Sequence, residues 1–466
     1  MREYDIITEP LTFIHIKHLA IHRQVGEHGR ARLEGHIADE DEQSFLEQLC
    51  KDVWEKIEIV GREGDRKTIF HGIVTGFSIS GGKDQKQMML EVTTGTCLMD
   101  RRPHYRTFQN PDMTYVELFR QITGNYQDSG LICNRPLTEA IGGLILQYEE
   151  TDWEFLRRMA SRFHSFLTPA FDMPGSRYFY DLQKGDSYEL PAQTPCTVHK
   201  KITEFAEKRS RGLGGMREGD CLEYEVESRE DYRIGDTLII RGQPYRIWRI
   251  ESCYDRGELL HQCWLKVREG MDVTETFCEQ AAGCSFPARI LQVEEDRVQV
   301  EALEDENSGQ EIRQWYPYAT VYSSPDGTGW YCMPEIGDMV RLHIPAHHEE
   351  QAYVASAVHL ETAGAERSNP DIKRIMNKHR KEIRFTPDSI VLTNNRGTRI
   401  ALTDQNGIEI VSEHAIALRA REDLTLSSET GSLTAAGTES VNLRQKNTGI
   451  DIGKGISFTG GEMRVQ

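Results

Sequence analysis

The C-terminal region of the chain alternates apolar and polar residues in a regular way. From Gly407 to Ser428 it reads GIEIVSEHAIALRAREDLTLSS, in which a pair of apolar residues separated by one residue returns every eight positions. Period-two alternation is typical of a β-strand, because successive side chains leave a strand on opposite faces. Followed through the region, the pairs predict a shared core at Ile400, Leu402, Ile408, Ile410, Ile416, Leu418, Leu424, Leu426, Val441, Leu443, Ile450 and Ile452.

This repeat predicts contacts between chains. Asn-Gly and Asp-Gly pairs are absent from the stretch except at its start, so we expect the strands to turn back seldom. One apolar row cannot bury itself, and an isolated strand leaves its N–H and C=O groups unpaired. We therefore predict that residues 383–466 form an intertwined, triple-stranded β-helix around a common axis. A single-chain parallel β-helix is the alternative, but eight residues are too few to circle a core alone.

The first 280 residues combine strands with helices. Apolar residues fall at helical spacing from Met113 to Ile122, where Thr114 can cap a helix. A second helix is predicted from Thr151, because Glu154 three positions later completes a capping box. Strands are predicted in LTFIHIKHLAI, KTIFHGIVTGFSIS, QMMLEVTTGT, GDTLIIRGQPYRIWRIESCYD and LLHQCWLKV.

The middle of the chain changes to short strands with tight loops from about Phe286, which predicts a small β-barrel such as an OB-fold. A polar, basic stretch without apolar periodicity follows it and is predicted to be a linker. The expected fold is mainly β with inserted helices: an α+β hub at 1–280, an OB-fold at 281–362, a linker at 363–382 and the repeat region at 383–466.

Composition narrows the function classes. The chain has 466 residues, 38% of them hydrophobic, which is ordinary for a folded protein. Its formal charge of -19 argues against nucleic-acid binding through phosphate contacts. We expect no signal peptide and no membrane span. The ten cysteines form no C-x-x-C pair, so free thiols are expected.

Candidate chemistry is sparse. The motifs G-x-S-x-G, H-E-x-x-H and G-x-x-x-x-G-K-[ST] are absent. His347-His348 with Glu349-Glu350 could ligate a metal, but a solvated loop is the expected meaning. His261 and Cys263 share a strand face, yet two ligands do not make a zinc site. We predict no catalytic residue, no metal and no cofactor.

Four segments in order give the chain a family resemblance. DRRPHYRTFQNPDMTYVELFRQI contains an R-x-F-Q-N element before a helix, and the octad repeat comes last. The chain resembles the VgrG-like spike proteins of contractile injection systems, relatives of the fused hub and spike proteins of phage tails. PAHHEEQ, at 345–351, departs from the family's usual turn. The other carrying residues are Asp152, Trp153, Phe155, Leu156 and Arg158 of a D-W-x-F-L-x-R stretch, and Pro334, Gly337, Asp338 and Val340 of an OB-fold signature.

The resemblance implies a structural rather than an enzymatic role. It implies a homotrimer whose hub of barrel-like subdomains approximates six-fold symmetry and seats a hexameric inner-tube protein beside baseplate proteins. The needle would puncture the target envelope and carry a PAAR-like tip protein or effectors. The particle would assemble in the cytoplasm and be ejected on contraction. The alternatives are a tail-associated cell-wall hydrolase and a trimeric adhesive fibre.

Overall fold

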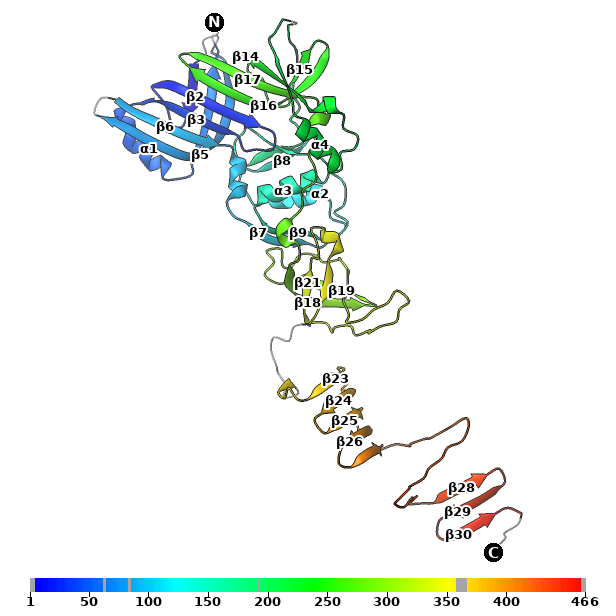
Figure 1. Ribbon diagram of the computed structural model, residues 1–466. Coiled ribbons are helices and arrows are strands. Elements are labelled where there is room, and N and C mark those ends of the chain that lie inside the picture. Colours follow the sequence, from blue (N-terminus) through cyan, green and yellow to red (C-terminus); the bar gives the residue numbers. More distant parts are fainter. Residues whose placement is uncertain (1–4, 62–63, 83–84, 192, 358–366, 462–466) are drawn as a thin grey trace. The chain divides into compact units, whose positions relative to one another are not determined.

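The fold is mainly β with inserted helices, as the sequence pattern predicted (Figure 1). The chain divides into two compact units, residues 1–360 and residues 361–466. No helix among the described residues is long and apolar enough to cross a membrane. The computed structural model describes residues 5–61, 64–82, 85–191, 193–357 and 367–461.

A twelve-stranded sheet holds the front of the first unit together. Its main path runs β1-β4-β5-β6-β3-β2-β16-β17-β14-β13, with β15 beside β16 and β12 beside β15. Helices α1 (Glu42–Leu49) and α4 (Ile202–Ser210) lie outside this path and were not foreseen. The strands are β1 (Asp5–Glu9), β2 (His15–Gln24), β3 (Arg30–Ile37), β4 (Trp54–Val60), β5 (Arg66–Gly82), β6 (Gln85–Thr93), β12 (Ser187–Glu189), β13 (Thr197–Lys200), β14 (Leu222–Ser228), β15 (Thr237–Ile240), β16 (Gln243–Asp255) and β17 (Glu258–Lys266).

The pairing of β2 with β16 joins two distant chain segments into one body. Alternation decides which side chains face inward: in β3, Ala31 and Leu33 are buried while Arg30 and Arg32 are exposed. One hydrophobic core contains residues of both segments, such as Leu33 and Ile250. The segments thus share a sheet and a core.

A buried polar cluster lies where β2 meets β16. Arg23 Nη2 donates to Ser252 Oγ at 3.0 Å, and Ser252 Oγ lies 2.8 Å from His261 Nδ1. Lys67 Nζ lies 2.5 Å from an Asp231 carboxylate oxygen nearby. Burial, reinforced by the Arg23 cation, lowers the pKa of His261 to about 4. The imidazole is therefore neutral in the folded protein near pH 7.

Two helices form the centre of the first unit, where Figure 1 draws them side by side. Thr114 caps α2 and Thr151 caps α3, as predicted. Each cap is a complete capping box with the glutamate three positions later, and the box at Thr114 was not predicted. Their apolar faces, including Leu118 and Trp153, build a second core. The elements are β7 (His104–Phe108), α2 (Tyr115–Thr123), β8 (Gly130–Cys133), β9 (Ile145–Glu150), α3 (Asp152–Ser161), β10 (Leu167–Pro169) and β11 (Arg177–Tyr180).

A five-stranded sheet ends the first unit, in the order β20-β19-β18-β21-β22. A bridge between Tyr318 and Val354 brings its two ends together, so that the sheet curls around a third core that includes Val300 and Leu342. The strands are β18 (Ser285–Glu294), β19 (Arg297–Ala302), β20 (Tyr316–Pro317), β21 (Met339–His343) and β22 (Tyr353–Ala355).

A buried ion-pair network ties this curled sheet to the helices. Arg158 of α3 donates to both oxygens of Glu150, at 2.7 to 3.1 Å, and to Glu349 at 2.9 Å. Arg162 pairs with the other oxygen of Glu349. Glu349 is only 2% exposed, so the expectation that His347 to Glu350 form a solvated loop is wrong at this residue. Two arginines compensate its charge, which is what makes burial possible.

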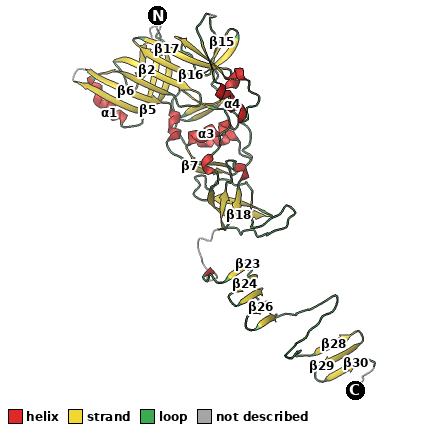
Figure 2. Cartoon of the chain, in the orientation of Figure 1, coloured by secondary structure: helices red, strands yellow, loops and turns green. Residues whose placement is uncertain are grey.

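The second unit consists of short strands between residues 373 and 459 (Figure 2). One sheet has the order β23-β24-β25-β26-β27 and another the order β28-β29-β30. The bounds are β23 (Lys373–Met376), β24 (Glu382–Thr386), β25 (Ser389–Thr393), β26 (Arg399–Thr403), β27 (Gly407–Val411), β28 (Val441–Gln445), β29 (Thr448–Ile452) and β30 (Ile456–Thr459).

Changing Glu349→Gln tests the ion-pair network. The variant leaves Arg158 and Arg162 buried with less negative charge, so we expect the free energy of unfolding to fall by about 3 kcal/mol. Urea unfolding of the full chain, followed by near-UV circular dichroism, measures the change. Glu350→Gln is the matched control, because Glu350 is the exposed neighbour and its change should cost almost nothing. Equal losses of unfolding free energy for the two variants would show that the buried network does not stabilise the fold more than the exposed Glu350 does.

The polar cluster predicts acid sensitivity. The folded-state pKa of His261 is about 4 against an ordinary 6.5, so the neutral ring's contribution is complete above pH 6.5 and is lost as pH falls towards 4. We expect wild type to lose about 3 kcal/mol more than His261→Gln between pH 7 and pH 4. Parallel urea titrations at several pH values measure this difference. Identical pH dependence of the two proteins would show that His261 does not titrate this way.

Candidate assembly surfaces

The first sheet of the second unit has one apolar face that is open to solvent. Ile400 lies opposite Ile410, and Leu402 lies opposite Ile408, so the predicted pairs align across β26 and β27. Ile408 is 72% exposed and Ile410 is 54% exposed. The face also contains Ile375 of β23, Ile383 and Phe385 of β24, and Ile390 and Leu392 of β25, all exposed. We call these nine residues the first apolar face.

The strands of this sheet turn back on themselves, before and at the start of the stretch for which few reversals were predicted. Between β25 and β26 the Asn394 side chain accepts from the Arg396 and Thr398 N–H groups at 2.8 and 3.0 Å. Gly397 completes that turn with φ 81°. Gly407 ends the next turn with φ 75°. Asn and Gly supply the left-handed backbone that a tight reversal needs, and these turn signals precede or only begin the stretch from which the expectation was drawn.

Residues 412–440 contain no strand, although their pattern predicts strands, and the structure describes all of them. Every residue from 413 to 440 is exposed, including Ile416, Leu418, Leu424 and Leu426. A strand needs a neighbour for its N–H and C=O groups. The Glu413 N–H donates to the Gly397 carbonyl at 3.3 Å, but the residues from Ile416 to Leu426 form no strand.

The last sheet repeats the arrangement of the first. Val441 lies opposite Ile452, and Leu443 lies opposite Ile450, which in turn lies opposite Phe458. Leu443 and Phe458 are exposed, and the strands again reverse through turns, at Lys446 with φ 51° and at Gly453 to Gly455. We call Val441, Leu443, Ile450, Ile452, Ile456 and Phe458 the second apolar face.

The first apolar face begins before residue 383, where the repeat region was predicted to start. Residues 373–376 form β23, inside the segment predicted to be a linker, and residues 358–366 lie outside the described part of the chain. Ile375 precedes Ile383 by eight residues, which is the spacing of the repeat. This spacing could have identified residues 373–376 as part of the repeat region. The basic residues between the two isoleucines favoured the interpretation of this segment as a linker.

The residues of the P-x-x-G-D-x-V signature shape a turn before β21. Gly337 has φ 92° and donates its N–H to the Ile290 carbonyl at 2.9 Å. Asp338 accepts from the Glu335 N–H at 2.9 Å, and Val340 is buried opposite Ala288. Pro334 is half-buried at the start of the turn. These contacts give the signature a structural role.

The five residues of the D-W-x-F-L-x-R stretch are all buried. Asp152 accepts from Arg106 at 2.5 Å and from Tyr126 Oη at 2.8 Å. The Trp153 ring packs edge-on against Tyr178 in the second core, where Phe155 and Leu156 also lie. Arg158 belongs to the ion-pair network. The stretch therefore joins α3 to its surroundings and presents nothing to solvent.

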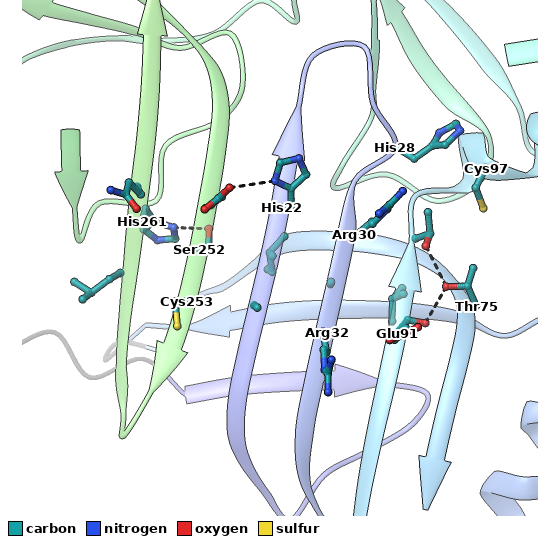
Figure 3. A pocket seen from close by; sticks show the side chains of 18 of the residues that line it. His22, His28, Arg30, Arg32, Thr75, Glu91, Cys97, Ser252, Cys253 and His261 are labelled. Carbon is teal, nitrogen blue, oxygen red and sulfur yellow. Dashed lines mark hydrogen bonds and ion pairs between the residues drawn. The ribbon is translucent and has the colours of Figure 1, made fainter. Parts of the chain in front are cut away.

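A groove of about 870 Å³ crosses the large sheet where β2 meets β16 (Figure 3). Its lining is mixed in charge: Arg30 and Arg32 lie near Glu91, while a His22 ring nitrogen lies 3.6 Å from Glu251. Both chain segments contribute to it. The mixed lining does not favour any one ligand class.

The Ser252–His261 pair in this groove's wall resembles the start of a nucleophilic site but lacks its properties. Both side chains are at most 3% exposed, and Arg23 already donates to the serine oxygen. An imidazole with a pKa near 4 is a weak general base at neutral pH. His347 and His348 pack against each other and against Phe277. Among the described residues, no group of three or more His, Cys, Asp or Glu side chains could hold a metal ion.

Known proteins resemble this chain in two ways: in the sequence of one segment and in the fold. Residues 36–163 match the model of the phage tail baseplate hub (GPD) family. The E. coli c3393 protein, a type VI secretion component with structural similarity to the T4 bacteriophage tail proteins gp27 and gp5, is 13% identical. The structural match covers 76% of this chain and 100% of the c3393 chain, with a TM-score of 0.54. None of the curated proteins matches the sequence.

A chain of the half-lidded Francisella PdpA–VgrG complex is 11% identical over 88% of each chain, with a TM-score of 0.57. A chain of the lidless complex is 10% identical over 86% of this chain and 94% of its own, with a TM-score of 0.55. Identities this low show a shared fold. Residues 36–163 of the chain are thus similar to the phage tail baseplate hub family, and its fold is similar to the folds of the E. coli c3393 protein and of chains in the PdpA–VgrG complexes.

Proposed function

We propose that this chain is the hub and spike at the tip of a contractile injection machine and that it works as a homotrimer. The observation that carries the proposal is the open apolar row of the second unit, which runs through both apolar faces and the exposed pairs between them. Covering each large side chain contributes roughly 1.5 to 3 kcal/mol, so leaving all of them in water is very unfavourable. Copies of the same chain supply a matching row.

Three copies suit these strands better than two. Each strand is about five residues long and offers two inward side chains, so a sheet of such strands is a narrow strip. Two such sheets packed face to face leave the apolar side chains along both edges of the interface exposed to water. Three strips around an axis close a triangular prism whose apolar residues all point inward, and closure removes the exposed margins.

The first unit is proposed to be the seat of the machine. The baseplate-hub match at residues 36–163 lies within it, and the large sheet joins two chain segments into one body. Three copies of these paired segments would offer six similar positions to a hexameric inner-tube protein, with baseplate proteins around them. A PAAR-like tip protein would close the far end of the needle.

The mechanism is mechanical. Contraction of a sheath would drive the needle into the target envelope, and the particle, assembled in the cytoplasm, would leave the cell with its tip or effector cargo. The needle has only to remain folded under force, and strands hydrogen-bonded in continuous ladders must break many bonds together. This role needs no catalysis. The matched family is described as a baseplate hub and the c3393 protein as a type VI secretion component.

Changing Ile410→Asp together with Leu418→Asp tests the shared axis. Each change buries a carboxylate among apolar side chains, so we expect assembly to be lost. Light scattering after size exclusion should give about 160 kDa for wild type, three times the chain mass of 53.4 kDa, and the single-chain mass for the variant.

Glu409→Asp together with Ala417→Asp is the matched control for this test. These positions precede Ile410 and Leu418 by one residue and belong to the opposite face of each strand, so the control should remain about 160 kDa. A wild-type protein that is stable as a single chain would refute the trimer. A fully assembled Ile410→Asp, Leu418→Asp variant would refute the assigned register.

The absence of an enzymatic role predicts that purified protein leaves the turbidity of a peptidoglycan suspension unchanged. Lysozyme in the same suspension serves as the positive control. Lysis that disappears on substitution of one carboxylate would establish a hydrolase instead.

A further inference from the structure

A basic stretch of this acidic chain surrounds helix α4. Residues 197–217 carry six Lys and Arg side chains against two Glu, whereas the whole chain has a formal charge of -19. No residue of α4 is buried, and Ile202 in its first turn is 62% exposed. Because opposite charges attract each other before two surfaces touch, this stretch favours contact with acidic partners.

A hollow of about 500 Å³ lies beside α4 in the first unit, and residues of α3, β16 and β17 also line it. Phe166, Trp248 and Met271 form an apolar part of its lining. The indole Nε1 of Trp248 is buried, and no described residue accepts its hydrogen. The hollow therefore offers a ligand an aromatic surface and an unused hydrogen-bond donor.

The hollow already holds one carboxylate, which two lysines surround. Lys266 Nζ donates to both oxygens of Glu204, at 2.9 and 3.1 Å, and Lys208 Nζ lies 2.8 Å from one of them. Burial opposes the ionisation of Glu204, but the hydrogen bonds from the lysines lower its pKa below the ordinary value. Lys266 is 5% exposed, and its Nζ lies 4.8 Å from the centre of the Trp248 ring. The lining thus accepts a carboxylate beside an aromatic ring.

The other two carboxylates of the lining also have partners within the chain. Glu154 accepts from the Thr151 N–H at 3.0 Å, as part of the capping box of α3. Glu27 accepts from Gln24 Nε2 at 2.6 Å. These acidic groups therefore serve local structure.

The cations of the lining outnumber its carboxylates by five to three. Arg158 is neutralised in the buried ion-pair network described above. Arg157 is exposed and forms no ion pair with another described residue. The Lys201 side chain is 53% exposed, and its Nζ lies 3.6 Å from a Glu223 oxygen. Arg157 and Lys201 are therefore the cations that an incoming partner can reach.

We propose that this hollow binds an acidic segment of a partner protein, whose carboxylates pair with Arg157 and Lys201 and whose neighbouring apolar side chain packs on Trp248. The site is defined by the first unit alone, so it does not depend on the proposed homotrimer. A protein segment fits better than nucleic acid, because Glu27 and Glu154 would repel a phosphate backbone. The hollow also accommodates only a few side chains.

Selection from a library of short random peptides tests the proposal. The full chain is immobilised, the ribosome-displayed library is applied, and peptides that also bind the Arg157→Gln, Lys201→Gln variant are removed. We expect the remaining peptides to be rich in Asp and Glu next to Leu, Phe or Trp. Fluorescence polarisation of one labelled peptide should then give an affinity about tenfold weaker for the variant than for wild type.

Arg135→Gln with Lys184→Gln is the matched control. Both residues are exposed, line a different hollow of about 710 Å³ and form no ion pair with another described residue. This control removes the same charge from the chain, so it should leave the affinity for the peptide almost unchanged. Near-UV circular dichroism should show the wild-type fold for both double variants, since all four side chains are exposed.

Three results would overturn the proposal. One is that no peptide distinguishes wild type from the Arg157→Gln, Lys201→Gln variant, or that the recovered peptides have no excess of acidic residues. Another is an equal loss of affinity in the control, which would show attraction to the basic surface in general. The third is a single-stranded oligodeoxynucleotide that displaces the peptide and binds wild type more tightly than the peptide does, which would make the site one for nucleic acid.

Discussion

A short strand with one apolar face cannot complete itself, and the second unit of this protein is built from such strands. Its backbone groups need a neighbouring strand, and its apolar side chains need a covering surface. Antiparallel pairing within the chain meets the first need from residue 373 to residue 411. It does not meet the second, because both apolar faces stay open in one chain. The proposed homotrimer would meet this second need.

The first unit buries charged side chains, and ion pairs compensate their charges. Arg158 and Glu349 come from α3 and from the loop before β22, far apart in the sequence, and meet inside the protein. Breaking such a pair leaves an uncompensated charge in a poorly solvated place. The pair therefore ties the curled sheet to the helices in one geometry. The residues at 345–351 depart from the usual turn of VgrG-like proteins, and Glu349 shows what one of them does.

Local features were predictable from the sequence and long-range pairings were not. The cap at Thr114 and the capping box at Thr151 were found because a helix start depends on residues close together in the sequence. Period-two alternation correctly predicted the strands that contain Ile400, Ile408, Val441 and Ile450, but no strand forms at Ile416 or Leu424. The pairing of β2 with β16 was missed, since it joins residues more than two hundred positions apart and leaves no local signal. The burial of Glu349 was missed because its two arginine partners lie 191 and 187 positions away in the sequence.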